Sequence, residues 1–324
     1  MPPGVGPAMT DLPLVVIADP IDADAVDLLR AGPCRVLDAS ADPASLPAAL
    51  LSAWALVVRS RTKVTDSLLA SAPQLRLVAR AGVGVDNVDL AAAARRGLVV
   101  VNAPLAATAS VAELSVALYL LLVRELRPKI DGTRAGRWER GTSGHELLGR
   151  TVGFLGYGRI AREVARRLAA FGTTAIAFDP FVRSTDDGTR LVPFDELLAA
   201  ADIVSVHAAL TDGSHHLLDA AAFARMRRGA FVVNVARGAL VDEAALLAAL
   251  ESGQVGGAAL DVLEVEPPVN RTLVEHPRVI VTPHLGASTH EAQRRAGRDV
   301  VEEVLRAARR EPLHHAVPLP EVRA

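Results

Sequence analysis

Three polar side chains able to bind a carboxylate and move a proton follow apolar runs late in the sequence. Arg237 comes after a β-branched run, Glu266 stands before two prolines, and His284 follows a Thr-Pro pair. Taken singly, each is more simply explained as a surface, loop or structural residue. Together they meet the needs of hydroxy-acid oxidation, which are a cation for the carboxylate, a base for the hydroxyl proton and an acid that orients the base. We therefore expect these three residues to be catalytic.

A glycine motif in the middle of the chain, TVGFLGYGRIA, closes an expected strand and opens an expected helix. Gly156 would permit the tight turn, and Gly158 would let the backbone approach a pyrophosphate at the helix N-terminus, with Arg159 adding a cation. Asp179 follows Gly156 by 23 residues, close to the offset of the acidic residue that binds ribose hydroxyls. Because that carboxylate would repel a 2′-phosphate, the motif predicts NAD rather than NADP.

These residues need a scaffold, and the hydrophobic pattern of the chain predicts one. In the first third, short β-branched runs alternate with segments of helical spacing, which predicts a parallel sheet covered on both faces. The expected strands there are Leu14–Asp19, Arg35–Leu37, Ala55–Arg59, Leu75–Arg80 and Leu98–Asn102. The second series comprises Val152–Leu155, Thr174–Asp179, Ile203–His207, Phe231–Asn234, Ala258–Val262 and Val279–Val281. Six strands with intervening helices suit a doubly wound nucleotide-binding sheet.

Two longer helices are expected outside these series. One runs from Val111 to Arg127 and is followed by a polar stretch, and the other runs from His290 to Arg309. The apolar window Val111–Val123 falls short of the roughly 20 residues needed to cross a bilayer, so we expect no membrane partner.

The composition narrows the class of protein further. The 324 residues hold 35 Lys plus Arg against 37 Asp plus Glu, a net charge of -2, which argues against a nucleic-acid partner. Cys34 is the only cysteine, so no disulfide framework or thiolate metal cluster can form, and we expect no metal. A single cysteine and an N-terminus without a basic and apolar signal pattern predict a cytoplasmic location.

Several motifs together resemble the D-isomer-specific 2-hydroxyacid dehydrogenases. They are RAGVGVDN from Arg80, the glycine motif, VARG from Val235, DVLEVEPP from Asp261 and PHLGAS from Pro283. The resemblance implies an α/β fold with two doubly wound parallel-sheet domains. One is a flavodoxin-like substrate domain, residues 1–104 plus 291–324, and the other is a Rossmann NAD-binding domain, residues 105–290.

The resemblance also assigns roles to individual residues. It implies that His284 is the general acid/base, that Glu266 is its hydrogen-bonded partner and that Arg237 binds the substrate carboxylate. Asp261 matches an aspartate near the nicotinamide, and Val83 matches a position facing both nicotinamide and substrate. The other implied cofactor contacts are Gly156, Gly158, Arg159, Ile160, Asp179, His207, Ala208, Val235 and Ala236. The run His207–Leu210 lacks the Thr and Pro usual in the family, so Ala208 can offer only its backbone.

Within the family, the segments around Arg59, Trp138 and Gly149 most resemble the D-3-phosphoglycerate dehydrogenases, which carry out the first step of serine biosynthesis. A phosphorylated substrate requires additional cations, for which Arg59 and Arg140 are the candidates. The backbone of Ala81 and Gly82 would bind a carboxylate. The sequence ends at Ala324 without the regulatory extension of some such enzymes, so regulation through that domain is not expected. The expected assembly is a homodimer or a dimer of dimers.

Two alternatives stay open. A glyoxylate or hydroxypyruvate reductase would share every catalytic residue and differ in the substrate pocket. An NAD-sensing protein resembling the C-terminal binding protein corepressors would keep the fold and use NAD to control assembly. Formate dehydrogenases of the superfamily are disfavoured because they lack the acidic partner of the histidine.

Overall fold

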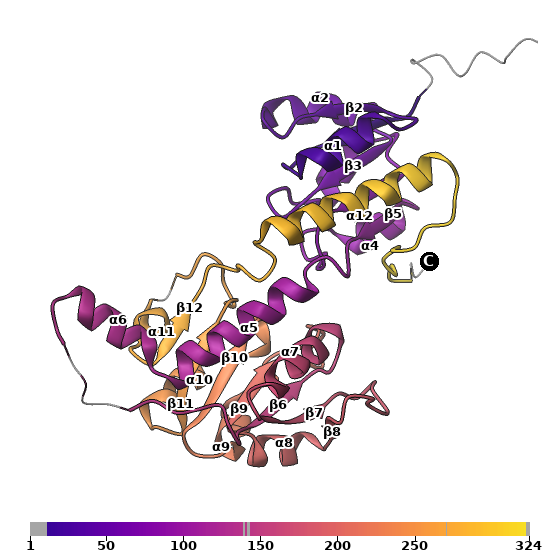
Figure 1. Cartoon of the computed structure of the whole chain (residues 1–324). Coiled ribbons are helices and arrows are strands. Elements are labelled where there is room, and N and C mark those ends of the chain that lie inside the picture. The colour runs from indigo at the N-terminus through magenta and orange to yellow at the C-terminus, as the bar shows by residue number, and fades with distance from the viewer. Residues whose placement is uncertain (1–11, 139, 141–142, 270, 322–324) are drawn as a thin grey trace, which may run out of the picture. The chain divides into compact units, whose positions relative to one another are not determined.

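The computed structural model describes residues 12–138, 140, 143–269 and 271–321. The chain divides into two compact units, Met1–Ala107 with Ala287–Ala324, and Thr108–Gly286 (Figure 1). The first unit therefore combines segments from both ends of the chain. The extents of the two functional domains stay a prediction.

The first unit contains a five-stranded parallel sheet in the order β2-β1-β3-β4-β5. This is the flavodoxin-like order of a doubly wound sheet. Helices α1 and α12 cover one face, and α2, α3 and α4 cover the other. The bounds are β1 Leu14–Ile17, α1 Ala23–Arg30, β2 Arg35–Asp38, a 3-10 turn Pro43–Ser45, α2 Leu46–Leu50, β3 Ala55–Val58, α3 Asp66–Ala70, β4 Leu77–Arg80, α4 Leu90–Arg95, β5 Val99–Asn102 and α12 His290–Ala308.

The segment after α12 returns to β5, the edge strand of this sheet. Ala316 forms an antiparallel bridge with Val101, and the Val317 amide donates to the Val100 carbonyl at 2.8 Å. Glu303 of α12 is 2% exposed and accepts the backbone N–H of His314 at 2.9 Å. The buried carboxylate and the strand edge thus hold the returning segment in place.

The second unit contains a seven-stranded parallel sheet in the order β12-β11-β10-β9-β6-β7-β8. Numbered from β6, six of its strands follow the Rossmann order 3-2-1-4-5-6, and β12 extends the far edge. The bounds are α5 Thr108–Val123, α6 Leu126–Arg134, β6 Thr151–Leu155, α7 Arg159–Ala169, β7 Thr174–Phe178, β8 Arg190–Leu191, α8 Phe194–Ala200, β9 Ile203–Val206, α9 Ala220–Arg225, β10 Ala230–Asn234, a 3-10 turn Gly238–Leu240, α10 Glu243–Glu251, β11 Val255–Leu260, α11 Thr272–Glu275 and β12 Val279–Val281. The predicted fold class is confirmed.

Two expectations about the second unit were wrong. The single helix expected from Val111 to Arg127 is two helices, because α5 ends at Val123 and α6 starts at Leu126. Pro128 explains the break, since its ring would clash with the carbonyl of Arg124 in a continuous helix. Glu125 at the break has a left-handed φ of 50°. The sheet also has a seventh strand, β8, which has only two residues and is too short to show the hydrophobic pattern of a strand.

None of the helices within the described ranges is long and apolar enough to cross a lipid bilayer.

Candidate active site

The glycine motif forms a turn between β6 and α7 that leaves room for a ligand. Gly156 has a φ of 85°, and a Cβ there would lie 2.6 Å from the Ala208 backbone, so only glycine fits. Gly158 caps α7, and among the described residues no heavy atom lies within 4 Å of its Cβ position. Backbone N–H groups at a helix N-terminus favour anions, so this end of α7 can bind a diphosphate.

Asp179 follows β7 and fixes this turn from the neighbouring strand. One carboxylate oxygen accepts the Tyr157 amide at 2.8 Å, and the other accepts the Phe181 amide at 2.8 Å. The Val182 amide also donates to the second oxygen, at 3.3 Å. A carboxylate has about four acceptor positions, so one is left for a ribose hydroxyl. Arg159 and Ile160 begin α7, where Arg159 is exposed and Ile160 is partly buried.

His207 and Ala208 follow β9, the strand that pairs with β6 on the opposite side from β7. The His207 amide donates to the Leu155 carbonyl at 2.8 Å, which brings the two strand ends together. The strand order reverses at this point, and ligands of open α/β sheets bind in the crevice outside such a switch point. Burial lowers the pKa of His207 to about 3, so the imidazole is neutral at physiological pH.

The three expected catalytic residues lie on loops that follow the neighbouring strands β10, β11 and β12. Asn234, fully buried at the end of β10, shapes the first loop by donating to the Arg237 carbonyl at 2.8 Å and accepting the Ala236 amide at 3.0 Å. Gly238 packs so closely on the next loop that a Cβ would overlap the Leu263 backbone. The first two loops are therefore held against each other.

Asp261 fixes the third loop. It is 1% exposed and accepts the Thr282 hydroxyl at 2.5 Å, the Leu285 amide at 2.7 Å and the Gly286 amide at 2.8 Å. The carbonyl of Asp261 also accepts the His284 amide at 2.9 Å. His284 itself has a left-handed φ of 55°, a conformation that non-glycine residues rarely adopt.

Glu266 and His284 form the hydrogen-bonded pair at the centre of the site. His284 Nδ1 lies 2.9 Å from Glu266 Oε2, while Glu266 Oε1 accepts the Leu263 amide at 3.1 Å. The two side chains are 52% and 39% exposed. With Nδ1 engaged by the carboxylate, Nε2 is the nitrogen left to exchange a proton with a ligand.

The expected substrate residues Arg59, Ala81 and Gly82 belong to the first unit, as does Val83. Arg59 follows β3, and its amide donates to Asp19 Oδ2 at 2.7 Å. The Ala81 amide donates to the Val58 carbonyl at 2.8 Å.

The carbonyls of the next two residues in this loop are also engaged. Asn102 Nδ2 donates to the Val83 carbonyl at 2.5 Å, and the Ala103 amide donates to the Gly82 carbonyl at 2.9 Å.

Arg140 is an exposed residue of the second unit. Its guanidinium lies 5.9 Å from the centroid of the Trp138 ring. Val235 is 9% exposed, and Ala236 is partly exposed in the loop after β10.

Sequence reasoning missed the residues that shape these loops, notably Asn234, Thr282 and Asp19. The available signal was a polar residue at the end of an otherwise apolar strand run, as in FVVN and VVIAD. The described residues contain no group of three or more His, Cys, Asp or Glu arranged to hold a metal ion.

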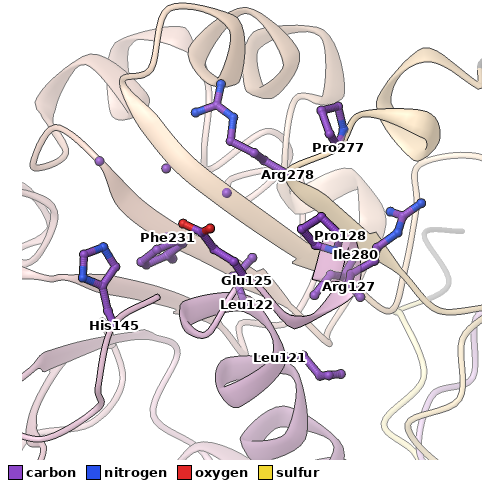
Figure 2. A pocket seen from close by; sticks show the side chains of 13 residues that line it. Leu121, Leu122, Glu125, Arg127, Pro128, His145, Phe231, Pro277, Arg278 and Ile280 are labelled. Atoms are coloured by element: carbon purple, nitrogen blue, oxygen red, sulfur yellow. The ribbon is translucent and has the colours of Figure 1, made fainter. Parts of the chain in front are cut away.

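A cavity of about 400 Å³ lies at the amino ends of strands β10, β11 and β12. Figure 2 shows Phe231, Glu125 and His145 on its walls. Because the catalytic loops follow the carboxyl ends of the same strands, this cavity is separate from them.

The chain belongs to the D-isomer specific 2-hydroxyacid dehydrogenase family, whose NAD binding domain matches residues 116–286. This membership agrees with the Rossmann order of the second unit and with the glycine turn at its switch point.

A "D-3-phosphoglycerate dehydrogenase" from Mycobacterium leprae is 48% identical over 299 residues, which make up 91% of this chain and 56% of the relative. The chain thus spans a little over half the length of this curated relative. The crystal structure of a glyoxylate reductase from Paecilomyes thermophila aligns with a TM-score of 0.86 and 30% identity, over 95% of this chain and 99% of that one. An NAD-dependent formate dehydrogenase from Staphylococcus aureus, in complex with NAD, has a TM-score of 0.84 and 30% identity, with coverage of 96% and 100%.

Proposed function

We propose that the protein oxidises D-3-phosphoglycerate to 3-phosphohydroxypyruvate with NAD, reversibly, as the first step of serine biosynthesis. The observation that carries the chemistry is the hydrogen-bonded Glu266–His284 pair, which joins the loops after β11 and β12. The loop of Arg237 follows β10, the strand next to β11. The similarity to relatives named D-3-phosphoglycerate dehydrogenase supports the choice of substrate.

Each of the proposed site residues has a separate role in the reaction. His284 Nε2 accepts the C2 hydroxyl proton of the hydroxy acid, and Glu266 stabilises the imidazolium through Nδ1. Arg237 binds the carboxylate, and Arg59 and Arg140 supply cations for the phosphate. The backbone of Ala81 and Gly82 is left out of the proposed carboxylate contacts, because the Ala81 amide donates to the Val58 carbonyl and the Gly82 amide donates to the Arg80 carbonyl, both at 2.8 Å. NAD, when bound, supplies the acceptor for the C2 hydride.

The cofactor site that we propose combines the open turn at Gly158, the N-terminus of α7 and the Asp179 carboxylate. Arg159, Ile160, His207, Ala208, Val235, Ala236 and Asp261 border it in the second unit, and Val83 is proposed to contact the nicotinamide. The carboxylate of Asp179 favours NAD over NADP because a 2′-phosphate would meet a like charge.

The test of the substrate compares phosphohydroxypyruvate, hydroxypyruvate and glyoxylate in parallel, followed by loss of NADH absorbance. We expect the highest kcat/KM with phosphohydroxypyruvate. A preference for glyoxylate would instead favour the alternative of a glyoxylate reductase. The chain is also similar to the glyoxylate reductase structure from Paecilomyes thermophila. Turnover of none of the three would contradict the enzymatic proposal.

The phosphate contacts are tested by Arg59→Ala and Arg140→Ala. Each variant should raise the KM for phosphohydroxypyruvate and leave that for hydroxypyruvate nearly unchanged. An unchanged KM for the phosphorylated substrate rejects the residue concerned.

His284→Ala should lower kcat by roughly 100- to 10,000-fold, the usual contribution of general acid–base catalysis. Glu266→Gln should lower it less, since the amide keeps a hydrogen bond but loses the charge. NADH affinity, measured by fluorescence titration, should stay within about twofold of wild type because neither residue lies in the glycine turn. A His284→Ala enzyme with near wild-type kcat would refute the assignment.

We also propose a homodimer or dimer of dimers, to be measured by light scattering, and a cytoplasmic location. The single cysteine, Cys34, is buried and free, which supports a reducing compartment.

A further inference from the structure

A chain of three polar side chains runs from α5 into the carboxyl end of β9. The Tyr119 hydroxyl is hydrogen-bonded to Ser205 Oγ, and Ser205 Oγ lies 2.8 Å from His207 Nε2. Tyr119 and Ser205 are both 0% exposed. Ser205 lies on β9 and His207 directly follows this strand, two positions further on, so their side chains share one face.

The direction of these two hydrogen bonds follows from the requirement that each buried polar group has a hydrogen-bond partner. Within the described chain, Ser205 is the only partner of the Tyr119 hydroxyl, so the phenol must donate or leave its proton unpaired. Ser205 then accepts from Tyr119, and its own proton has one remaining acceptor, His207 Nε2. With Nε2 accepting, the proton of the neutral imidazole must be on Nδ1.

His207 Nδ1 has no hydrogen-bond partner among the described residues. It is also absent from the fully buried, unpartnered polar atoms of those residues, so Nδ1 is accessible. It is therefore a donor that a ligand can reach. His207 lies beside the Gly156 turn, where β6 and β9 diverge at the switch point of the sheet. The ligand that belongs at this point of the family's NAD binding domain is the dinucleotide, which is rich in acceptor oxygens.

We propose that Tyr119 and Ser205 are positioning residues that fix His207 in its Nδ1–H tautomer, so that its imidazole donates a hydrogen bond to NAD. The two buried hydroxyls orient His207, as the Glu266 carboxylate orients His284 in the same unit. The two histidines thereby differ in role, because Glu266 can stabilise a charged imidazolium whereas two neutral hydroxyls keep His207 uncharged. The low pKa of His207 agrees with this neutral state.

The tautomer is tested by nitrogen-15 NMR of the histidine side chains in the ligand-free full chain. Wild type should show His207 with Nδ1 protonated and Nε2 unprotonated at neutral pH. Tyr119→Phe frees the Ser205 hydroxyl to reverse, and Ser205→Ala removes the donor to Nε2, so both variants should show a mixture of tautomers or the opposite one. Ser115→Ala is the matched control, because it deletes another buried α5 hydroxyl, which donates to the Val111 carbonyl at 2.7 Å.

The cofactor contact is tested by NADH titration of the same proteins. Tyr119→Phe and Ser205→Ala should weaken NADH binding by roughly 3- to 10-fold, the effect of one hydrogen bond, and Ser115→Ala should not. An Nε2-protonated or doubly protonated His207 in wild type overturns the proposal, as do variants that keep the wild-type tautomer. A changed tautomer with unchanged NADH binding overturns the cofactor contact. Neither readout depends on which hydroxy acid the enzyme oxidises.

Discussion

Asp19 and Asp261 show how single buried carboxylates hold functional loops in this protein. Each follows a parallel strand, is 1% exposed and accepts several hydrogen bonds from a neighbouring loop. Asp19 engages the Arg59 amide together with the Thr62 amide and hydroxyl. A backbone held in this way keeps its shape without support from the ligand.

Asp19→Asn should lower the free energy of unfolding of the first unit by about 2 kcal/mol at neutral pH, since hydrogen bonds to a charged acceptor are lost. Burial acts to raise the pKa of Asp19, but hydrogen bonds from Thr62 and Arg59 and the charge of Arg61 hold it below its ordinary value of 3.8.

Because the folded-state pKa is depressed, this stabilisation is present above about pH 4 and is lost as pH falls through the folded pKa. Urea denaturation between pH 7 and pH 3, in wild type and Asp19→Asn, measures the difference. The gap between the two proteins should narrow at low pH, and a gap that widens would contradict the mechanism.

Gly158→Ala tests the diphosphate site at the residue scale. The Cβ meets no described atom within 4 Å and φ is -82°, so the variant should fold with unchanged thermal stability. NADH binding should nevertheless weaken by at least roughly tenfold, because the methyl group occupies the space where the diphosphate approaches.

Two control substitutions accompany Gly158→Ala. Gly213→Ala also meets no neighbour and should change neither property, whereas Gly156→Ala would overlap Ala208 and destabilise the fold. Wild-type NADH affinity in Gly158→Ala would place the diphosphate elsewhere.

At the scale of elements, the start of α10 and the loop after β11 hold each other. The Glu264 amide donates to Glu243 Oε1 at 2.7 Å, and the Glu243 amide donates to Glu264 Oε1 at 3.2 Å. His216 Nε2 lies 3.0 Å from the same Glu264 oxygen. Since Glu266 follows two residues later, this reciprocal pair steadies the loop that orients His284.

Glu264→Ala should therefore lower the free energy of unfolding by about 1 kcal/mol, the usual effect of losing an acceptor at a helix start. It should also lower kcat by roughly tenfold with little change in KM, because Glu266 becomes less precisely placed. Glu251→Ala is the matched control, since Glu251 is exposed and lines, together with Glu264, a cavity of about 500 Å³. Equal effects of the two substitutions on kcat would contradict the positioning role.

The elements themselves were largely predictable, because parallel strands buried on both faces give near-continuous apolar runs such as ALVV in β3. The break between α5 and α6 was visible only as Pro128, and β8 was too short to detect. The hydrogen bonds of Asp261 and the Tyr119–Ser205 contact join residues far apart in the sequence, so spacing alone could not reveal them.

On the scale of the whole molecule, each compact unit has its own buried hydrophobic core. In the first unit, the core covers both faces of the sheet. Chains built from two such units commonly depart from two-state unfolding. The NAD binding domain of the family matches the second unit from residue 116 onward. Ligand stabilisation should therefore act mainly on that unit.

Calorimetry should show two transitions, and NADH at 100 times its Kd should stabilise the second unit by about 2.7 kcal/mol while moving the other transition little. Gly158→Ala at the same NADH concentration provides the control, since NADH should shift the transition of its second unit less than in wild type. Equal displacement of both transitions by NADH would show that the units unfold together.

The returning segment on β5 has a consequence for how the protein behaves in a crowded solution. An uncovered edge strand is a row of unpaired amides and carbonyls on which another chain can add a strand. Val317 and Ala316 occupy that row, and Pro318 and Pro320 follow immediately with no amide proton to offer. The first unit thus ends its own sheet with a strand-breaking cover, which protects it against edge-to-edge aggregation.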